Sequence, residues 1–443
     1  LGLGSLMALT RQAGHEVFFI DNYLQCSDFI QQRFLQENRV DCIGIYANTI
    51  CYRDTLRMFS EIEELREQGA WRGKMLVGGP HTSVALETIP EFVDHVVQGE
   101  GEHALMDILQ GRETERVIPG RRVDDLDSLP FQPWDVFAAL PYDFTCPWID
   151  ASHVFTLNTS RGCPFNCAFC SVGSIWGNRY VCQSPERVVS EMQMLMNDYG
   201  AQGFYFREDH FTLSLKRTTS FCELLLSKNI NTQWACETRV DRMTEELVRL
   251  MARAGCKAFY LGVESGSERI LALLNKQITL AQIENTIRWC KKYGIKTYCS
   301  LIVGVPGETY DDFLQSEALM QRLRPHSYSF NVFVGIPKSP LYLQCLKDKS
   351  YEYMDDLGLL YLPGFDIKCG YFYGLDSSVL VDHKFRQRTA FDRQLNARWR
   401  RRKIYWTVAG MIPPRLRQAL RPLKNRVAKV LGSVSRPGQN NED

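Results

Sequence analysis

Three cysteines in one short stretch are the residues of this chain whose type and spacing best suit metal chemistry. Cys163, Cys167 and Cys170 are separated by three and by two residues, so their thiolates can converge from one tight loop on three irons of a four-iron cluster. The fourth iron then has no protein ligand, and such an open position distinguishes a catalytic metal site from a closed structural one. A zinc site would need a fourth Cys or His nearby, and none lies between Cys170 and Cys182. Structural zinc and chance clustering are the alternatives.

The remaining cysteines indicate a reducing environment. The chain has 15 cysteines, and those outside this loop are scattered singly, several of them inside apolar runs where a free thiol packs as a small hydrophobic group. This distribution predicts one metal site in a cytoplasmic protein and not a disulfide framework.

The elements that must position the cysteine loop alternate between strand and helix. Six strand-like runs are separated by helical stretches, and the loop directly follows the first run. The runs are Val154–Thr159, Gly203–Arg207, Thr232–Glu237, Ala258–Val263, Thr297–Val303 and Ser327–Val334. Six such units predict an open parallel barrel of the TIM type, because the closed form needs eight, and its active site should lie at the carboxyl ends of the strands.

The N-terminal part alternates in the same way. Its predicted strands are Val17–Ile20, Asp41–Ala47, Lys74–Gly79 and His95–Gln98, with amphipathic helical stretches between them. The helical stretch Leu3–Ala13 is expected to follow a first strand that lies upstream of Leu1. This alternation predicts an α/β fold with a doubly wound parallel sheet.

The carboxyl ends of these N-terminal strands are a second candidate site. Ligands of doubly wound sheets bind there, and glycines let a flat or phosphate-bearing ligand approach the backbone. The residues expected at these ends are Asn48, Thr49, Gly78, Gly79, His81, Gly99, Glu100 and Gly101. The alternative is that the glycine pairs only form turns.

The length of 443 residues allows two sizeable cores and a tail. With 45% hydrophobic and 23% charged residues the chain has the composition of a folded protein, and no run reaches the roughly 18 to 20 apolar residues of a membrane-spanning helix. The first residue is Leu1 and not Met, and the residues after it lack the pattern of a secretory signal, so the true N-terminus is expected upstream. The predicted parts are a sheet domain (1–123), a linker (124–150), a barrel (151–342), a C-terminal subdomain (343–383) and a basic amphipathic tail (384–443).

The tail is strongly basic, whereas the rest of the chain is acidic. Between Lys384 and Leu431 there are 15 Lys or Arg residues and one acidic residue, a net charge of +14, so the remainder of this +1 chain carries −13. Aromatic and aliphatic residues are interleaved with the basic ones, as on a helix that lies flat in a membrane interface. We favour peripheral contact with the inner membrane face over nucleic-acid binding or a solvated helix packed on the acidic remainder.

From about Val154 to Tyr342 the sequence resembles the radical S-adenosylmethionine (SAM) superfamily. The three cysteines match its CxxxCxxC ligands, and Phe169 matches the aromatic residue before the last cysteine. The resemblance implies a [4Fe-4S] cluster whose free iron chelates SAM and whose electron cleaves SAM to methionine and a 5'-deoxyadenosyl radical. An electron donor such as flavodoxin or ferredoxin is then expected.

Four successive strand ends match the SAM contacts of this superfamily. The matched residues are Glu208, Asp209, Arg239, Glu264, Ser265, Val303 and Gly304. The resemblance implies that Glu208 or Asp209 receives the SAM amino group and that Arg239 pairs with the SAM carboxylate. It also implies that Glu264 and Ser265 bind the ribose hydroxyls and that Val303 and Gly304 lie against the adenine. The alternative for any single acidic residue at a strand end is a helix cap or a solvated group.

Sheet and barrel together resemble the cobalamin-binding (class B) radical SAM enzymes, over about Leu1 to Tyr342. Segments 13–17, 77–81 and 97–102 carry this likeness. It implies that cobalamin is bound and that the eight N-terminal strand-end residues contact it. One departure is that no Asp-x-His-x-x-Gly motif is present, so the lower histidine ligand of other cobalamin proteins is either upstream of Leu1 or absent.

The reaction implied is methylation of an unactivated carbon of a small or lipid-like substrate, with the hard chemistry carried by the cofactors. The alternative within the family is radical oxidative cyclisation or rearrangement without methyl transfer. The alternative of another class is a non-catalytic cobalamin or iron-sulfur sensor. Trp176, Tyr180 and the segment Tyr328–Tyr342 are expected near the substrate, although aromatic residues there could equally be core.

Overall fold

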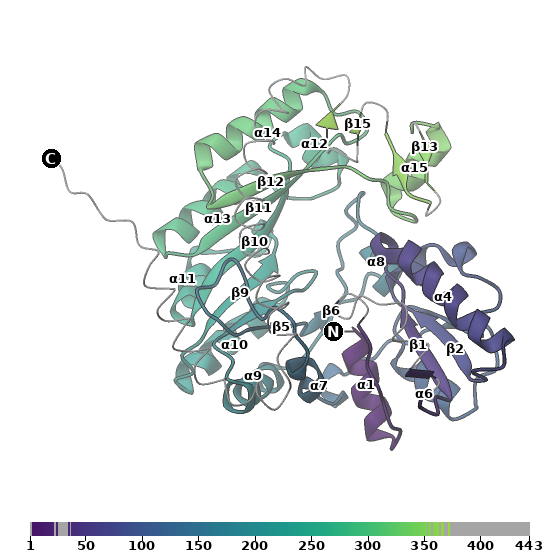
Figure 1. Cartoon of the computed structure of the whole chain (residues 1–443). Coiled ribbons are helices and arrows are strands. Elements are labelled where there is room, and N and C mark those ends of the chain that lie inside the picture. Colours follow the sequence, from purple (N-terminus) through teal and green to yellow (C-terminus); the bar gives the residue numbers. More distant parts are fainter. Residues whose placement is uncertain are drawn as a thin grey trace, which may run out of the picture. The chain divides into compact units, whose positions relative to one another are not determined.

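The fold is taken from a computed structural model, which describes residues 2–21, 24, 34–35, 37–351, 353–355, 358–362, 365–366 and 371–372. The described residues all belong to one compact unit, residues 1–375. Figure 1 shows the order of the elements along the chain. The predicted basic tail, 384–443, and residues 373–383 of the predicted C-terminal subdomain lie outside the described residues.

A four-stranded parallel sheet with the order β1-β2-β3-β4 forms the N-terminal part. Its strands are β1 (Cys42–Tyr46), β2 (Lys74–Gly78), β3 (His95–Gln98) and β4 (Val117–Pro119). Three of them confirm predicted runs, and β4 is not among the predictions. The predicted strand Val17–Ile20 is wrong, since these residues belong to no strand. Their apolar side chains pack individually instead, as Phe19 does against Phe137 with ring centroids 5.4 Å apart.

Both faces of this sheet are covered by helices. Met75 and Val77 of β2 share a core with helix α4 (Tyr52–Glu67), whereas Leu76 points to the other face and packs with helix α6 (Glu102–Leu109). Successive side chains of a strand point to opposite faces, so a continuous apolar run suits a strand that is buried on both sides. The doubly wound arrangement is therefore confirmed.

Shorter elements connect this sheet to the barrel. They are α1 (Gly2–Gln12), η1 (Thr49–Cys51), α5 (Pro80–Val84), η2 (Leu86–Thr88), η3 (Leu126–Ser128) and α7 (Trp134–Ala139). The helix α1 confirms the prediction for Leu3–Ala13, and η3 and α7 fall within the predicted linker.

The barrel is an open six-stranded parallel sheet with the order β12-β11-β10-β9-β8-β5. Its strands are β5 (Val154–Leu157), β8 (Gly203–Phe206), β9 (Gln233–Thr238), β10 (Cys256–Glu264), β11 (Lys296–Val303) and β12 (Ser327–Val332). All six correspond to predicted runs within a few residues. The strands lie in the sheet in their sequence order, because each strand lies beside its predecessor after a crossover helix.

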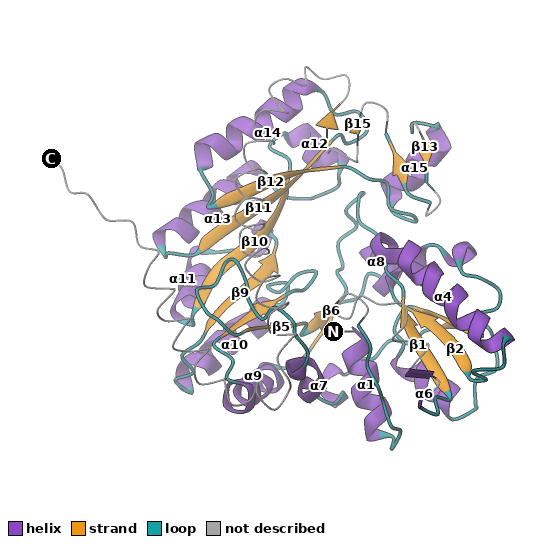
Figure 2. Ribbon diagram, in the orientation of Figure 1, coloured by secondary structure: helices purple, strands orange, loops and turns teal. Residues whose placement is uncertain are grey.

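The crossover helices lie along one face of the barrel sheet (Figure 2). They are α9 (Pro185–Tyr199), α10 (Leu215–Ser227), α11 (Glu245–Arg253), α13 (Leu280–Lys292) and α14 (Tyr310–Leu323), and the 3-10 turn η4 (Val240–Arg242) precedes α11. The short helix α12 (Glu268–Leu273) follows the carboxyl end of β10 and packs with the cysteine loop and with α15 (Pro340–Asp348). Strand residues that face the crossover helices, such as Phe204, Trp234 and Leu261, are 0% exposed. We call the opposite face of the sheet the concave face.

The remaining elements are short. They are β6 (Ser160–Arg161), α8 (Val172–Trp176), β7 (Val181–Cys182), α15 (Pro340–Asp348), β13 (Tyr353–Met354), β14 (Leu360–Tyr361), β15 (Phe365–Asp366) and β16 (Tyr371–Phe372). In the described part of the chain, no helix combines the length and the apolar character that crossing a membrane requires.

Candidate active site

The cysteine loop leaves the barrel through a tight antiparallel pairing of β6 with β7. Gly162, between β6 and the first cysteine, has a φ of +82°, and a Cβ atom added there would lie 2.2 Å from the carbonyl oxygen of Arg179. Only glycine fits this turn without strain, because it has no Cβ and tolerates positive φ. The turn therefore fixes where the loop from Cys163 onward begins.

Three hydrogen bonds hold the loop, and two of them are with the segment that follows α12. Ala168 donates its amide hydrogen to the carbonyl of Leu274 (2.8 Å), and the side-chain amide of Asn275 donates to the carbonyl of Asn166 (2.8 Å). From the other side, the amide of Leu341 donates to the carbonyl of Ala168 (2.8 Å). The loop is thus positioned by two distant parts of the barrel.

The three cysteines are free thiols, with Cys167 buried and the other two partly exposed. Burial raises the pKa of Cys170 to about 11 and also raises the pKa of Cys163, and the neighbouring Cys167 thiol adds to both effects. Among the described residues no group of three or more His, Cys, Asp or Glu side chains is placed to hold one metal ion. Three thiols on one loop without a fourth ligand suit a cluster that shares them among three irons.

The two carboxylates after β8 have different surroundings. Glu208 is 3% exposed and accepts hydrogen bonds from the backbone amide (2.7 Å) and hydroxyl of Thr159 and from the hydroxyl of Ser160, so it ties the end of β8 to the segment that leads from β5 into β6. Asp209 is exposed, and surrounding protein raises its pKa chiefly by desolvation. Asp209 is therefore the carboxylate that is free to receive a cationic amino group.

Arg239 lies directly against the cysteine loop. Its guanidinium stacks 3.8 Å above the Phe165 ring, and its Nη1 donates to Sγ of Cys167 (3.4 Å). Its other donors contact Asp241 (2.8 Å) and the carbonyl of Lys276 (2.5 Å). A fixed fork of donors suits both this role and the predicted contact with the SAM carboxylate.

Glu264 forms a buried ion pair that the sequence reading missed. Its Oε1 is 2.7 Å from Nζ of Lys276, and both side chains are less than a tenth exposed. A Cβ atom at Gly262 would lie 2.6 Å from this carboxylate oxygen and 2.9 Å from the ammonium, so the pair covers the concave face of β10 at this glycine. The signal for Lys276 was weak, because a lysine after a short helix is usually solvated.

The other predicted SAM residues lie at the ends of β10 and β11. Ser265 is 0% exposed, and its hydroxyl accepts from the amide of Ser267 (3.1 Å). Val303 ends β11 and is buried, while the amides of Gly304 and Val305 both donate to one carboxylate oxygen of Glu308. These residues shape the strand ends at which the adenosine was predicted.

The eight N-terminal residues do lie at or just beyond the carboxyl ends of β1, β2 and β3. Gly78, Gly79 and Gly99 are partly exposed, so backbone without side chains faces outward there, which fits the approach of a flat ring. His81 is different, since it is 0% exposed and stacks 3.7 Å from the ring of Tyr52. Its two ring nitrogens are bonded to hydroxyls at 3.0 and 2.8 Å, and burial lowers its pKa to about 4. The histidine thus connects two threonine side chains behind this edge, and neither of its ring nitrogens is free.

Glu100 ties this edge to the cysteine loop. One of its oxygens accepts from Arg161 Nη1 (2.8 Å), and the other lies 2.8 Å from Nε of Arg122. Arg161 also bonds Glu102 (2.6 Å), and the Glu100 side chain is 1% exposed. Trp176, expected near the substrate, lies 5.9 Å from both guanidinium groups. We call Glu100, Glu102, Arg122 and Arg161 the ion-pair cluster; sequence reading missed both arginines.

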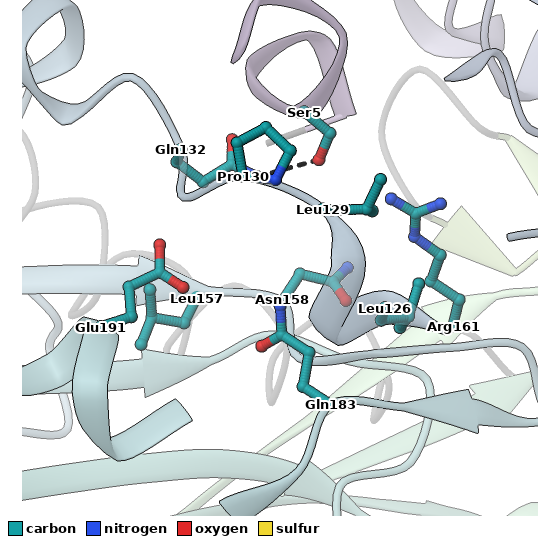
Figure 3. Close-up of a pocket in the computed structure, with 10 residues that line it drawn as sticks. All are labelled: Ser5, Leu126, Leu129, Pro130, Gln132, Leu157, Asn158, Arg161, Gln183 and Glu191. Carbon is teal, nitrogen blue, oxygen red and sulfur yellow. Dashed lines mark hydrogen bonds between the residues drawn. The ribbon is translucent and has the colours of Figure 1, made fainter. Parts of the chain in front are cut away.

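A small cavity beside this cluster is too small for any of the expected ligands (Figure 3). Its volume is about 30 Å³, enough for about two water molecules. Ser5, Gln132, Asn158, Arg161 and Glu191 are among the residues that line it, and the Gln132 side chain donates to the Ser5 hydroxyl (2.9 Å). Cofactor and substrate must therefore bind elsewhere.

Comparison with known families divides the chain as the geometry does. Residues 157–320 match the family described as the radical SAM superfamily, and residues 1–109 match the B12 binding domain. An uncharacterized methyltransferase of Pyrococcus horikoshii is 29% identical over 364 residues, which are 77% of each chain. The anaerobic magnesium-protoporphyrin IX monomethyl ester cyclase of Cereibacter sphaeroides is 24% identical, over 78% of this chain and 60% of the cyclase.

A solved structure shares the fold over both parts. The radical SAM methyltransferase TsrM of Kitasatospora setae, solved with cobalamin and a [4Fe-4S] cluster, has a TM-score of 0.66 and 17% identity, and the match covers 82% of this chain and 74% of TsrM. The two domains occur here in one chain. The chain therefore belongs to the cobalamin-binding (class B) radical SAM enzymes, which use a [4Fe-4S] cluster, SAM and cobalamin.

Proposed function

We propose that this enzyme methylates an unactivated carbon of a small-molecule substrate. The observation that carries the proposal is the ion-pair cluster, in which Arg161 of the cysteine loop bonds Glu100 and Glu102 at the edge of the sheet. A cluster-binding loop and a cobalamin-binding edge held together in this way suit a reaction that needs both cofactors. When bound, these cofactors supply a 5'-deoxyadenosyl radical and a transferable methyl group.

The residues of the chain have distinct tasks in this proposal. Cys163, Cys167 and Cys170 hold the cluster, and Asp209 receives the SAM amino group in its exposed carboxylate. Arg239 holds the SAM carboxylate while its stacking on Phe165 excludes water from the buried side of the loop. Because a radical must meet its substrate before it meets solvent, this exclusion of water matters as much as the binding.

The ribose, adenine and corrin contacts complete the proposal. Glu264, paired with Lys276, accepts hydrogen bonds from the ribose hydroxyls, with Ser265 beside it. Val303 and Gly304 form the backbone edge for the adenine. For cobalamin we propose the partly exposed edge that Asn48, Thr49, Gly78, Gly79, Gly99 and Gly101 form, with the buried side chains of Glu100 and His81 supporting it.

The direct test uses the full chain, reconstituted without oxygen with iron, sulfide and cobalamin. With SAM labelled by deuterium in the methyl group and dithionite as reductant, we expect 5'-deoxyadenosine to form and the label to appear on the corrin. A Cys163→Ala control should form neither product above background. Formation of 5'-deoxyadenosine without transfer of the label would instead support oxidative cyclisation or rearrangement. This is the second candidate, because the chain is similar to the cyclase of Cereibacter sphaeroides.

Two further proposals concern partners. Flavodoxin or ferredoxin is the electron donor we propose, since the cluster needs one electron for each SAM cleaved. Location in the cytoplasm and contact with the inner membrane face through the basic tail are also proposed, from the +14 charge of residues 384–431. Flotation with anionic vesicles, with and without the residues after Thr389, tests the membrane contact, and equal binding of both forms would rule it out.

A further inference from the structure

The concave face of the barrel differs from the helix-covered face in both exposure and composition. Tyr205, Glu237, Tyr260 and Tyr298 are partly exposed, whereas each neighbouring strand residue, such as Cys236 or Phe259, is almost fully buried under the helices. Successive side chains alternate between the faces, so these four residues point to the same side of four adjacent strands. Closed barrels fill this space with branched aliphatic side chains.

Strand register places three of these residues side by side. Glu237 of β9 is the register partner of Tyr260 in β10, which in turn is the partner of Tyr298 in β11. The rings of Tyr260 and Tyr298 stack with centroids 4.6 Å apart, and Trp148 lies 5.1 Å from the second ring. The hydroxyl of Tyr205 donates to Oε1 of Glu237 (2.6 Å). We call Trp148, Tyr205, Glu237, Tyr260 and Tyr298 the aromatic row.

Neutral hydrogen-bonding groups extend the row across β12. Tyr298 donates its hydroxyl to Ser329, and the exposed side chain of Asn331 donates to the hydroxyls of Ser300 (3.0 Å) and Ser329 (3.1 Å). The carbonyl oxygen of the Asn331 side chain is left as an acceptor, since all of these bonds use its amide hydrogens.

The aromatic row lies on the same face as the predicted SAM contacts. Glu237 precedes Arg239 by two residues, and Tyr260 precedes Glu264 by four, which corresponds to about 7 and 13 Å along a strand. The Glu264–Lys276 pair covers the concave face at Gly262, immediately next to Tyr260 along β10. A molecule resting on the row would therefore lie within reach of a radical formed at the strand ends.

The chemistry of the row selects among substrate classes. A hydrocarbon would cover the Glu237 carboxylate and the side-chain carbonyl of Asn331 without donating a hydrogen bond to either, and each buried polar group left unpaired costs about 1 to 3 kcal/mol. A cationic or anionic substrate would meet Arg207 as well as Glu237, because Nε of Arg207 lies 3.9 Å from this carboxylate. An uncharged ring with hydroxyl groups offers apolar faces to the tyrosines and donors to Glu237 and Asn331.

We propose that the aromatic row is the substrate site and that the substrate is an uncharged ring system carrying hydroxyl groups. This inference rests on the proposed function, and it replaces the lipid-like substrate with a more polar class. The partly exposed edges of the stacked Tyr260 and Tyr298 rings contact the substrate ring, and Glu237 accepts a hydrogen bond from a hydroxyl group. No role in the radical step is assigned to these side chains.

Binding of probes to the anaerobic holoenzyme, with SAM but without reductant, tests the proposal by saturation-transfer NMR. The hydroxylated probes are phenyl β-glucoside, thymidine and myo-inositol, compared with phenylcyclohexane and phenethylammonium at equal concentration. We expect a hydroxylated probe to bind most tightly and its affinity to fall at least fivefold in Glu237→Gln and in Tyr260→Ala. Because no reductant is present, the result is independent of whether radical chemistry or methylation occurs.

A second glutamate and tyrosine pair provides matched controls. On the helical side, the hydroxyl of Tyr293 donates to Glu245 (2.9 Å), so Tyr293→Ala and Glu245→Gln remove the same atoms as the two row variants, but away from the concave face. Both controls should bind the probe as the parent does, and all variants should match it in iron content and circular dichroism. Tighter binding of phenylcyclohexane or phenethylammonium, binding unchanged in both row variants, or no binding of any hydroxylated probe would each overturn the proposal.

Discussion

The carboxyl group of Glu308 shows at the scale of one residue how the barrel balances hydrogen bonds against desolvation. It accepts from the amides of Gly304 and Val305, which favour the charged form, but burial opposes it and raises the pKa to about 7. Its second oxygen has no hydrogen-bond partner among the described residues. Protonation of that oxygen near neutral pH is the result.

This pKa predicts a stability that falls as pH rises. The unfolded carboxyl ionises near 4.5 and the folded one near 7, so the folded state binds more protons between these values. Stability should be greatest below about pH 4.5 for this group and decline until about pH 7.5, by about 2 kcal/mol after allowance for partial exposure. We expect Glu308→Gln to remove this decline, measured by urea unfolding at pH 5.5 and 8.

An exposed glutamate provides the comparison. Glu284 pairs with Arg322, and this hydrogen bond lowers the pKa of its carboxyl, so it does not titrate in the same window. Glu284→Gln should keep the pH dependence of the parent. A Glu308→Gln protein that still loses stability between pH 5.5 and 8 as the parent does would contradict the assignment.

Residues with a distinctive spacing were predictable, and residues that act through distant contacts were not. Cys163, Cys167 and Cys170 were found from sequence because their spacing is informative by itself. Lys276 and Arg161 were missed because their partners lie 12 and about 60 positions away, at Glu264 and Glu100. A single basic residue has a solvated surface role in most proteins, so only the fold could show these two as buried ion-pair partners.

At the scale of elements, alternation of strand and helix predicted the barrel strands well. Apolar runs bounded by helical stretches gave all six, because each strand is buried on at least its helix-facing side. The short elements β4, β6 and β7 were missed, since two or three residues carry too little periodicity to be recognised. The false strand Val17–Ile20 had the right composition but pairs with no neighbour, and pairing is a tertiary property.

The turn before the first cysteine gives a prediction for an element. We expect Gly162→Ala to disturb the loop, because its Cβ would lie 2.2 Å from a backbone oxygen and because φ is +82°. The free energy of unfolding should fall by more than about 2 kcal/mol, and iron and sulfide bound after reconstitution should fall at least twofold.

Gly177 separates the effect of collision from that of backbone strain. Its φ is +67°, but a Cβ atom there would meet nothing within 4 Å. Gly177→Ala should therefore cost only about 1 kcal/mol and leave the iron content unchanged. Equal iron loss in the two variants would show that the collision with Arg179 is not what positions the loop.

At the scale of the whole molecule, the ion-pair cluster joins the two parts that hold cofactors. Arg161→Ala should lower the free energy of unfolding by about 3 kcal/mol, because two buried carboxylates lose their shared cation. Arg161→Lys should recover part of this loss. The measurement is urea unfolding followed separately by circular dichroism and by cobalamin absorbance, and we expect the corrin to dissociate at lower urea in Arg161→Ala.

Arg121 serves as the control for this prediction. It is one residue from Arg122, but its side chain is 69% exposed and pairs with Asp107, so Arg121→Ala should cost less than about 0.5 kcal/mol. If Arg161→Ala unfolds at the same urea concentration as the parent, the cluster does not contribute to stability.

The lack of a side chain at Gly262 offers a way to obtain an inactive reference protein. A methyl group at this position would push apart Glu264 and Lys276, whose side-chain ends are the atoms it meets, while the backbone of β10 keeps ordinary room. Gly262→Ala should thus keep the fold and the iron centre but lose the anchor for the ribose. Such a protein would allow substrate complexes to be trapped for crystallography without turnover.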